Sequence, residues 1–214
     1  LDDWLRSVIT HEYTHILQGD MAGGLPAVIR NLFGRYPFPF GIFNSTFPND
    51  LQPLWLIEGL ATQEETLAGT TDRAYSAYAD MLLRIAILED RFPTIDQAAG
   101  QLDSWPNGHV HYLFGARFLD YIRQQFGDKA IKNLNLNYSD NFFPLFVDTN
   151  ARETLGVSYV TLWNKWKAEL TEKYVSQRGE LESIGLTMTQ PLMNKGDENL
   201  GAKMGSTGDI LYTS

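Results

Sequence analysis

The stretch HEYTH at residues 11–15 constrains this chain more than any other feature of its sequence. Residues four apart on a helix lie about one turn apart, so His11 and His15 would project from the same face. Apolar residues recur at helical spacing on both sides and predict a helix over residues 2–18. These apolar residues are Leu5, Val8, Ile9, Ile16 and Leu17. The alternative is that two histidines share an exposed helix face by coincidence.

Two imidazole nitrogens at this spacing can reach one zinc ion, and a glutamate beside the first histidine can take a proton from water. Glu12 occupies that position. A catalytic zinc site normally has a third protein ligand. Glu58 is the candidate, because it stands in the apolar stretch PLWLIEGLA at residues 53–61, where a carboxylate needs a partner. The alternative is that Glu58 faces solvent beside Glu64 and Glu65.

Composition excludes several classes of protein. The net charge of −9 and the lack of a basic stripe argue against nucleic acid as the main partner. There are no cysteines, so disulfides and thiolate metal sites are excluded. No apolar run is long enough to span a membrane, and no signal peptide is visible. The chain starts at Leu1 inside an amphipathic pattern, which we interpret as a fragment of a longer protein.

The pattern along the chain predicts a mainly α-helical fold. After the first helix, we expect helices near 26–33, 53–68, 72–91, 108–126 and 158–178, with a shorter one beginning at Asp128. Ser158 is the expected N-cap of the last helix. From residue 183 the chain becomes turn-rich and finishes in the strand-like DILYTS. We therefore predict a helical domain at 1–182 and a short β segment at 183–214.

HEYTH together with P-x-W-x-x-E-G-x-A at 53–61 resembles the gluzincin zinc metallopeptidases, particularly the bacterial peptidase MA-like group. The segments HYLFGARFLDYIRQQFG at 111–127 and TLGVSYVTLWNKWKAEL at 154–170 are similar to later helices of that group. The resemblance implies a zinc-dependent peptidase. It assigns the metal to His11, His15 and Glu58, and the activation of water to Glu12.

The resemblance also identifies places where this sequence departs from the family. The third ligand follows His15 by 43 residues, a longer separation than in thermolysin-like enzymes, so residues 19–50 are expected to form an inserted loop. Thr62 stands where those enzymes carry an acidic residue that orients a histidine. Glu65 and Asp20 are two candidates for that task.

Tyr112 occupies the tyrosine position of the later helix, and we expect its hydroxyl to stabilise the oxyanion of the transition state. The alternative for Tyr112 is packing in the core. His109 and His111 lie beside it, and for both we favour the role of a helix-start or surface residue.

The final residues GAKMGSTGDILYTS resemble the repeat of TolB-like β-propellers, in which a turn precedes an inner strand. The resemblance implies an intramolecular propeller that continues beyond Ser214, and a location in the bacterial periplasm or cell envelope. The alternative is an ordinary C-terminal strand or hairpin. Gluzincins also carry a β-sheet before the zinc helix, which residues 1–10 cannot supply. We therefore expect the helical half of a gluzincin with an exposed apolar surface.

The sequence thus predicts a zinc peptidase that hydrolyses a peptide or protein substrate with metal-activated water. Two rivals belong to other classes. One is a peptide-binding or scaffolding module of a larger envelope protein, with little or no activity. The other is a structural helical domain that supports a propeller.

Overall fold

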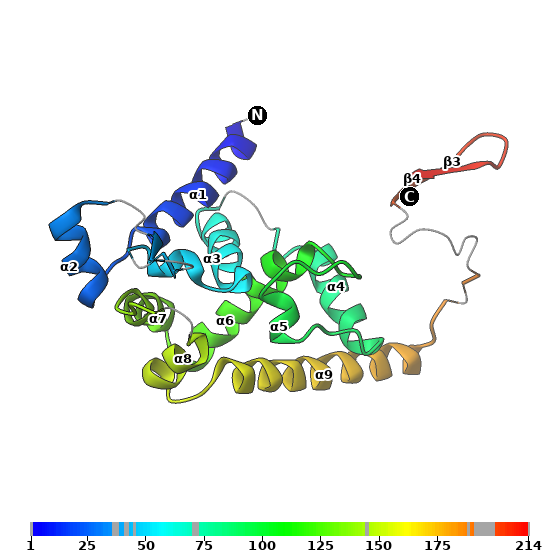
Figure 1. Cartoon of the computed structure of the whole chain (residues 1–214). Coiled ribbons are helices and arrows are strands. Elements are labelled where there is room, and N and C mark those ends of the chain that lie inside the picture. The colour runs from blue at the N-terminus through cyan, green and yellow to red at the C-terminus, as the bar shows by residue number, and fades with distance from the viewer. Residues whose placement is uncertain are drawn as a thin grey trace. The chain divides into compact units, whose positions relative to one another are not determined.

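The computed structural model describes residues 2–35, 39–40, 43–44, 46–69, 73–143, 146–187, 189–190 and 200–213 (Figure 1). The chain divides into two compact units, Leu1–Val175 and Ser176–Ser214. The division falls inside a long helix, because that helix continues beyond its last buried residue, Tyr174. The expected boundary at residue 183 lies just before the end of the same helix.

The predicted fold class, mainly α with a short β segment at the C-terminus, is confirmed. The helices are α1 (Asp2–Gly19), α2 (Gly24–Phe33), α3 (Leu54–Leu67), α4 (Ala77–Leu88), α5 (Ile95–Ala98), α6 (Gly115–Phe126), α7 (Ala130–Ser139), α8 (Val147–Leu155) and α9 (Tyr159–Ile184). A 3-10 turn, η1 (Pro48–Leu51), precedes α3, and a π-helical turn, η2 (Val110–Phe114), leads directly into α6. None of the described helices is long and apolar enough to cross a membrane.

The few strands are short and antiparallel. β1 (Pro39–Phe40) pairs with β2 (Phe43–Asn44) inside the expected loop region. In the second unit, β3 (Leu200–Met204) pairs with β4 (Ile210–Thr213), with Lys203 opposite Leu211 and Met204 opposite Ile210. The turn between them is closed by the amide of Gly205, which donates to the carbonyl oxygen of Asp209 at 2.7 Å. The strand-like end of the sequence is therefore one side of a hairpin.

Aromatic side chains from α3, α6 and α9 form the centre of the first unit. The ring centroid of Trp55 lies 5.3 Å from that of Phe118 and 5.0 Å from that of Tyr159. The centroids of Phe118 and Trp163 are 4.8 Å apart. All four side chains are almost fully buried. Burial of such large apolar groups is the main favourable contribution to folding, at about 25 cal/mol for each Å² removed from water.

Two glycines allow α3 to contact the start of α6 backbone to backbone. A methyl group added at Gly59 would lie only 2.5 Å from the carbonyl carbon of Gly115 and 2.8 Å from the amide nitrogen of Ala116. Because these are backbone atoms, no side-chain rotation could relieve the overlap. This close approach fixes α3 against η2 and α6, which follow each other without a break.

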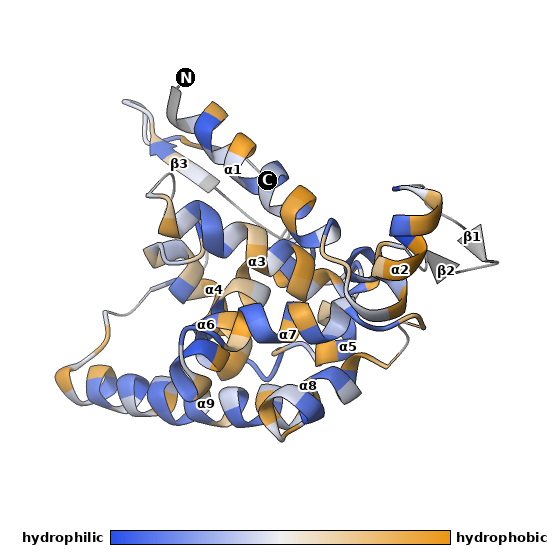
Figure 2. Cartoon of the chain, turned by 90° about the vertical axis from the view of Figure 1, so that its left-hand side faces the viewer, coloured by the Kyte–Doolittle hydropathy of each residue, from blue (hydrophilic) through white to orange (hydrophobic). Residues whose placement is uncertain are grey.

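Helix α1 packs against α3 in a different way, because none of its described side chains belongs to the hydrophobic core. Its buried side chain is polar: the amide of Gln18 donates to Gln52 Oε1 at 2.7 Å and to Asn135 Oδ1 at 3.0 Å. Large apolar side chains of α1 and α2 face solvent, and Figure 2 shows hydrophobic residues along both helices. They include Trp4, Leu5, Ile9, Ile16, Leu25, Val28 and Leu32.

The observed helices differ from the expected ones in several places. The short α5 was not expected, and the start of the expected helix at 108–126 is the π turn η2. α4 spans Ala77–Leu88, well inside the predicted 72–91, and begins at Ser76, whose hydroxyl accepts from the amide of Ala79 at 3.2 Å. α8 was not expected, although Val147, Ala151 and Leu155 recur every four residues along it and pack in or against the core. α9 begins as predicted, with the Ser158 hydroxyl accepting from the amide of Thr161 at 3.1 Å, and runs six residues beyond the predicted end.

Candidate metal centre

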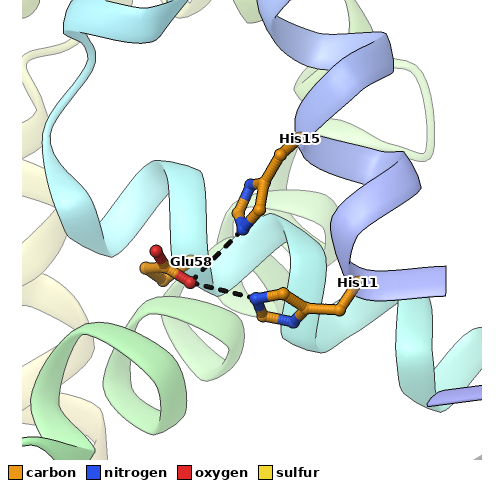
Figure 3. Close-up of side chains that lie close together, drawn as sticks. All are labelled: His11, His15 and Glu58. Carbon is orange, nitrogen blue, oxygen red and sulfur yellow. Dashed lines mark hydrogen bonds and ion pairs between the residues drawn. The ribbon is translucent and has the colours of Figure 1, made fainter. Parts of the chain in front are cut away.

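The facing sides of α1 and α3 bring together the three predicted metal ligands. His11 and His15 project from successive turns of α1, and their ring centroids are 4.7 Å apart. Glu58 Oε2 on α3 lies 3.1 Å from His11 Nε2 and 3.5 Å from His15 Nε2 (Figure 3). One ligand atom from each of the three residues lies within 4.8 Å of the others. All three side chains are partly buried.

The electrostatics of this cluster follow from its hydrogen bonds. Hydrogen bonds to Glu58 and then to Glu65 raise the pKa of His11 from 6.5 to about 9, against the opposing effect of burial. Hydrogen bonds from His11 and His15 lower the pKa of Glu58 from 4.5 to about 2. The protein without a metal therefore holds a protonated imidazole against an ionised carboxylate. A cation is favoured at this point, because two carboxylates lie within hydrogen-bonding distance of one ring.

The donor atoms fit a zinc ion chemically. Zinc in proteins is bound by imidazole nitrogens and carboxylate oxygens, and a catalytic site uses three such ligands. Here both Nε2 atoms point toward the same carboxylate oxygen, as Figure 3 shows. The cluster therefore supplies two nitrogens and one oxygen from two packed helices. His11, His15 and Glu58 could hold the metal as the sequence predicted.

Glu65 orients His11. Its side chain is 4% exposed, and its Oε1 accepts from His11 Nδ1 at 2.6 Å while Oε2 accepts from the Ser7 hydroxyl at 3.0 Å. A proton held on Nδ1 leaves Nε2 as the nitrogen with a lone pair for a metal. Of the two candidates for this task, Glu65 is therefore the one that contacts a histidine. Asp20 instead forms ion pairs with Arg30 and Arg35, each at 3.0 Å.

Thr62, four residues after Glu58, does not orient a histidine. Its side chain is fully buried, and its hydroxyl has no hydrogen-bond partner among the described residues. His15 Nδ1 likewise has no hydrogen-bond partner among them. Only the first of the two histidines is thus oriented by a carboxylate in the described part of the chain.

Glu12 lies beside the cluster on the exposed side of α1. It lines a cavity of about 380 Å³ together with Trp4, Ser7, Val8, His11, Glu65, Arg73 and Tyr112. A carboxylate at this place can exchange protons with a solvent molecule in the cavity. The structure therefore brings Glu12 to the same open space as His11, on the side away from the aromatic core.

Tyr112 lines the same cavity from the π-helical turn η2. Its ring centroid is 6.1 Å from that of His11, and burial raises the pKa of its hydroxyl. A π turn inserts an extra residue into a helix and often marks a functional site. The tyrosine is thus near the predicted metal ligands rather than in the hydrophobic core. Its expected role as a hydrogen-bond donor stays a prediction.

The other two histidines lie outside the cluster. The rings of His109 and Tyr78 meet edge to face, with centroids 5.9 Å apart. His111 is buried, although we expected a helix-start or surface residue, and desolvation lowers its pKa. It lies within η2, and the π turn directs it inward. Its ring packs 4.4 Å from that of Tyr112.

Two residues of the site escaped the sequence reasoning. Ser7 is one helical turn before His11, a spacing that could have indicated a shared face. Arg73 precedes α4, and its guanidinium Cζ lies 4.4 Å from the ring centroid of Tyr112. No signal near residue 73 predicts this contact, because it depends on how the chain returns from α3.

Comparison with known proteins gives no relative from which a function could be transferred: no family model, curated protein or solved structure matches this chain.

Proposed function

We propose that this chain is a zinc-dependent peptidase of the gluzincin type. One observation carries the proposal: ligand atoms of His11, His15 and Glu58, from helices 47 residues apart at His11 and Glu58, lie within 4.8 Å of one another. An accidental pair of histidines on α1 would not require a partly buried glutamate of α3 to face both rings. The sequence pattern around the three residues adds the resemblance to gluzincins.

Each residue has a role that follows from its position. His11, His15 and Glu58 would hold the ion, and Glu65 would keep Nε2 of His11 turned toward it. When bound, zinc supplies the Lewis acidity that lowers the pKa of water and polarises a carbonyl group. Glu12 would accept the proton from the attacking water and pass it to the leaving amine. The hydroxyl of Tyr112 would donate a hydrogen bond to the oxygen that becomes negative in the transition state.

The proposal also includes a TolB-like β-propeller at the C-terminus and an extracytoplasmic location. The hairpin of β3 and β4 supports it, because a propeller blade is built from antiparallel strands. The remaining support is the likeness of residues 201–214 to the propeller repeat. The substrate would be a peptide or a protein.

The first experiment measures zinc and hydrolysis in the same preparations. We expect one zinc per chain in the wild-type protein and in Glu12→Gln, and loss of zinc in His15→Ala. His109→Ala is the matched control and should keep its zinc, since that ring packs edge to face with Tyr78 outside the cluster. Hydrolysis of a peptide mixture, followed by mass spectrometry, should fall by about 10² to 10⁴ in Glu12→Gln.

Each part of the proposal can fail separately. Absence of stoichiometric zinc from the wild-type protein would exclude the metal centre and leave a structural helical domain. Full zinc content without hydrolysis would favour the peptide-binding module instead. Equal hydrolysis by wild type and Glu12→Gln would show that Glu12 is not the general base.

A further inference from the structure

The cavity beside the metal centre continues past Arg73. A second cavity, of about 90 Å³, is lined by Tyr78, Ala79, Leu82, His109 and Leu113. Arg73 and Tyr112 line both cavities. The arginine therefore stands where the space beside the predicted ligands meets a small, mainly apolar recess.

The guanidinium of Arg73 is held close to His11. Its Cζ lies over the Tyr112 ring at 4.4 Å, which is a cation–π contact. Its Nη1 lies 4.0 Å from Glu65 Oε1, the same oxygen that accepts from His11 Nδ1 at 2.6 Å. The guanidinium and the first predicted metal ligand thus share one carboxylate oxygen. Half of the Arg73 side-chain surface is nevertheless exposed to the cavity and solvent.

The charges lining the first cavity make Arg73 distinctive. The other ionisable side chains that line this cavity are the carboxylates of Glu12 and Glu65, the His11 ring and the Tyr112 hydroxyl. Arg73 is therefore the permanently charged cation among the residues that line this cavity. The second cavity is lined by the apolar Ala79, Leu82 and Leu113 and by the rings of Tyr78 and His109, so Arg73 is its permanently charged cation as well. A substrate anion would be directed to the junction.

We propose that Arg73 forms a subsite for a substrate carboxylate placed one or two residues from the bond to be cleaved. The inference rests on the proposed peptidase function. Consecutive Cα atoms of a peptide are 3.8 Å apart. A carboxylate on a substrate residue next to the cleaved bond can therefore reach the guanidinium of Arg73, which shares Glu65 Oε1 with the predicted ligand His11. A guanidinium matches a carboxylate through two parallel hydrogen bonds. Two sources carry this chemistry: the C-terminal α-carboxylate of a peptide, and the side chain of an internal Asp or Glu.

The kinetic test uses N-acetylated peptides that differ only in this group. One pair ends in a free acid or an amide, and a second, amidated pair carries an internal Glu or Gln. We expect kcat/KM to be about 10-fold higher for the preferred acid than for its neutral partner. Arg73→Met should bring that ratio to about 1, and Arg73→Lys should restore part of it. The peptide pair whose kcat/KM ratio falls in Arg73→Met identifies the source of the carboxylate.

Arg152→Met is the matched control. Arg152 is exposed and pairs with Asp148 one turn away on α8, outside both cavities. It should keep the wild-type ratio. A ratio that Arg73→Met leaves unchanged for both pairs would overturn the subsite. Thermal unfolding of each variant would establish that the chain is folded.

A binding test separates the subsite from the peptidase proposal. Glu12→Gln protein is titrated with N-acetylalanine and with N-acetylalaninamide, and binding is followed by NMR. We expect the acid to bind at least about 10-fold more tightly than the amide, and Arg73→Met to remove the difference. If neither compound binds, or both bind equally, a subsite for the C-terminal carboxylate is excluded whether or not the chain cleaves peptides. If the acid binds and no peptide is cleaved, only the peptidase proposal fails.

Discussion

Helix α3 lies between α6 and α1, and it contacts these two neighbours with opposite chemistry (Figures 1 and 2). Toward α6 it presents Trp55 and Gly59, which pack against aromatic rings and bare backbone. Toward α1 it presents Glu58 and Glu65, which bond to histidine and serine side chains. The first contact resists change because atoms are close-packed. The strength of the second contact depends on the protonation of His11 and Glu58.

The site therefore has a rigid part on α3 and a part on α1 whose interactions can change. Glu58 is fixed by the helix that enters the core, whereas both histidines stand on a helix attached mainly through polar groups. We therefore expect substitutions on the α6 side to unfold the unit. Changes on the α1 side should alter metal affinity and pH dependence.

The largest expected effect is on the α6 side. Gly59→Ala would force a methyl group against the backbone of Gly115 and Ala116, so we expect a loss of about 3 kcal/mol or more in the free energy of unfolding. The measurement is urea denaturation followed by circular dichroism. Gly179→Ala is the control: Gly179 is helical and has no neighbouring atom within 4 Å, so that change should stabilise by up to about 1 kcal/mol. Equal effects of the two substitutions would contradict the close approach.

The second effect is a pH dependence of the metal-free protein on the α1 side. The pKa of His11 is raised from 6.5 to about 9, so its stabilising contribution is complete below about pH 6.5 and is lost as the pH rises through 9. The pKa of Glu58 is lowered from 4.5 to about 2, so its contribution is present above about pH 4.5 and is lost as the pH falls through 2. The combined contribution is therefore greatest between about pH 4.5 and 6.5.

We expect the loss between pH 6.5 and 9 to be no more than about 3 kcal/mol. Denaturation in the presence of a chelator, repeated across this range, measures it. His11→Asn should remove the pH-dependent part and serves as the comparison. Wild-type and variant curves that run parallel above pH 6.5 would exclude the ion pair of His11 with Glu58 and Glu65.

The third effect concerns the orientation of His11. Glu65→Gln keeps an acceptor for the Nδ1 proton and removes the charge, so we expect zinc affinity to fall by about 10- to 100-fold. Competition with a chelating dye measures it. The neighbouring Glu64→Gln removes the same charge from α3 and should change affinity much less. An equal loss of zinc affinity in Glu64→Gln and Glu65→Gln would show that the loss comes from overall charge and not from the bond to His11.

The smallest effect is expected on the outer surface of α1. Ile9 is 57% exposed, and Ile9→Ser should change the free energy of unfolding by less than about 0.5 kcal/mol in this chain. Leu56→Ala, at a fully buried position of α3, provides the contrast at about 2 to 5 kcal/mol. A large loss for Ile9→Ser would mean that α1 packs more of its apolar surface than the structure shows.

The part of the site that the sequence could predict lies within single helices. The spacing of His11 and His15 fixed their common face, and the apolar setting of Glu58 indicated that it needed a partner. Whether Glu64 or Glu65 would turn toward α1 depends on the rotation of α3, which Gly59 and Trp55 set through their contact with α6. Arg73 could not be predicted, because its contact with Tyr112 joins distant parts of the chain.

The same distinction explains the errors in the fold. α8 was missed although Val147, Ala151 and Leu155 mark one apolar face, and its start is held by a tertiary contact, because the Asp148 carboxylate accepts from the amide of Tyr159 at 2.8 Å. The start of α9 was predicted because its cap is local. Its end was not, because the charged residues beyond Tyr174 continue the helix without burying a face. One of their local interactions is the ion pair of Arg178 with Glu182.

The backbone contact between Gly59 and Gly115 has a consequence for how the site could change over time. Gly59 directly follows Glu58, and Gly115 comes three residues after Tyr112. The backbones that carry the carboxylate and the tyrosine are therefore held together by main-chain contact, which persists as long as both glycines do. The side chains of Glu58 and Tyr112 can then be replaced one at a time while their backbones stay in place.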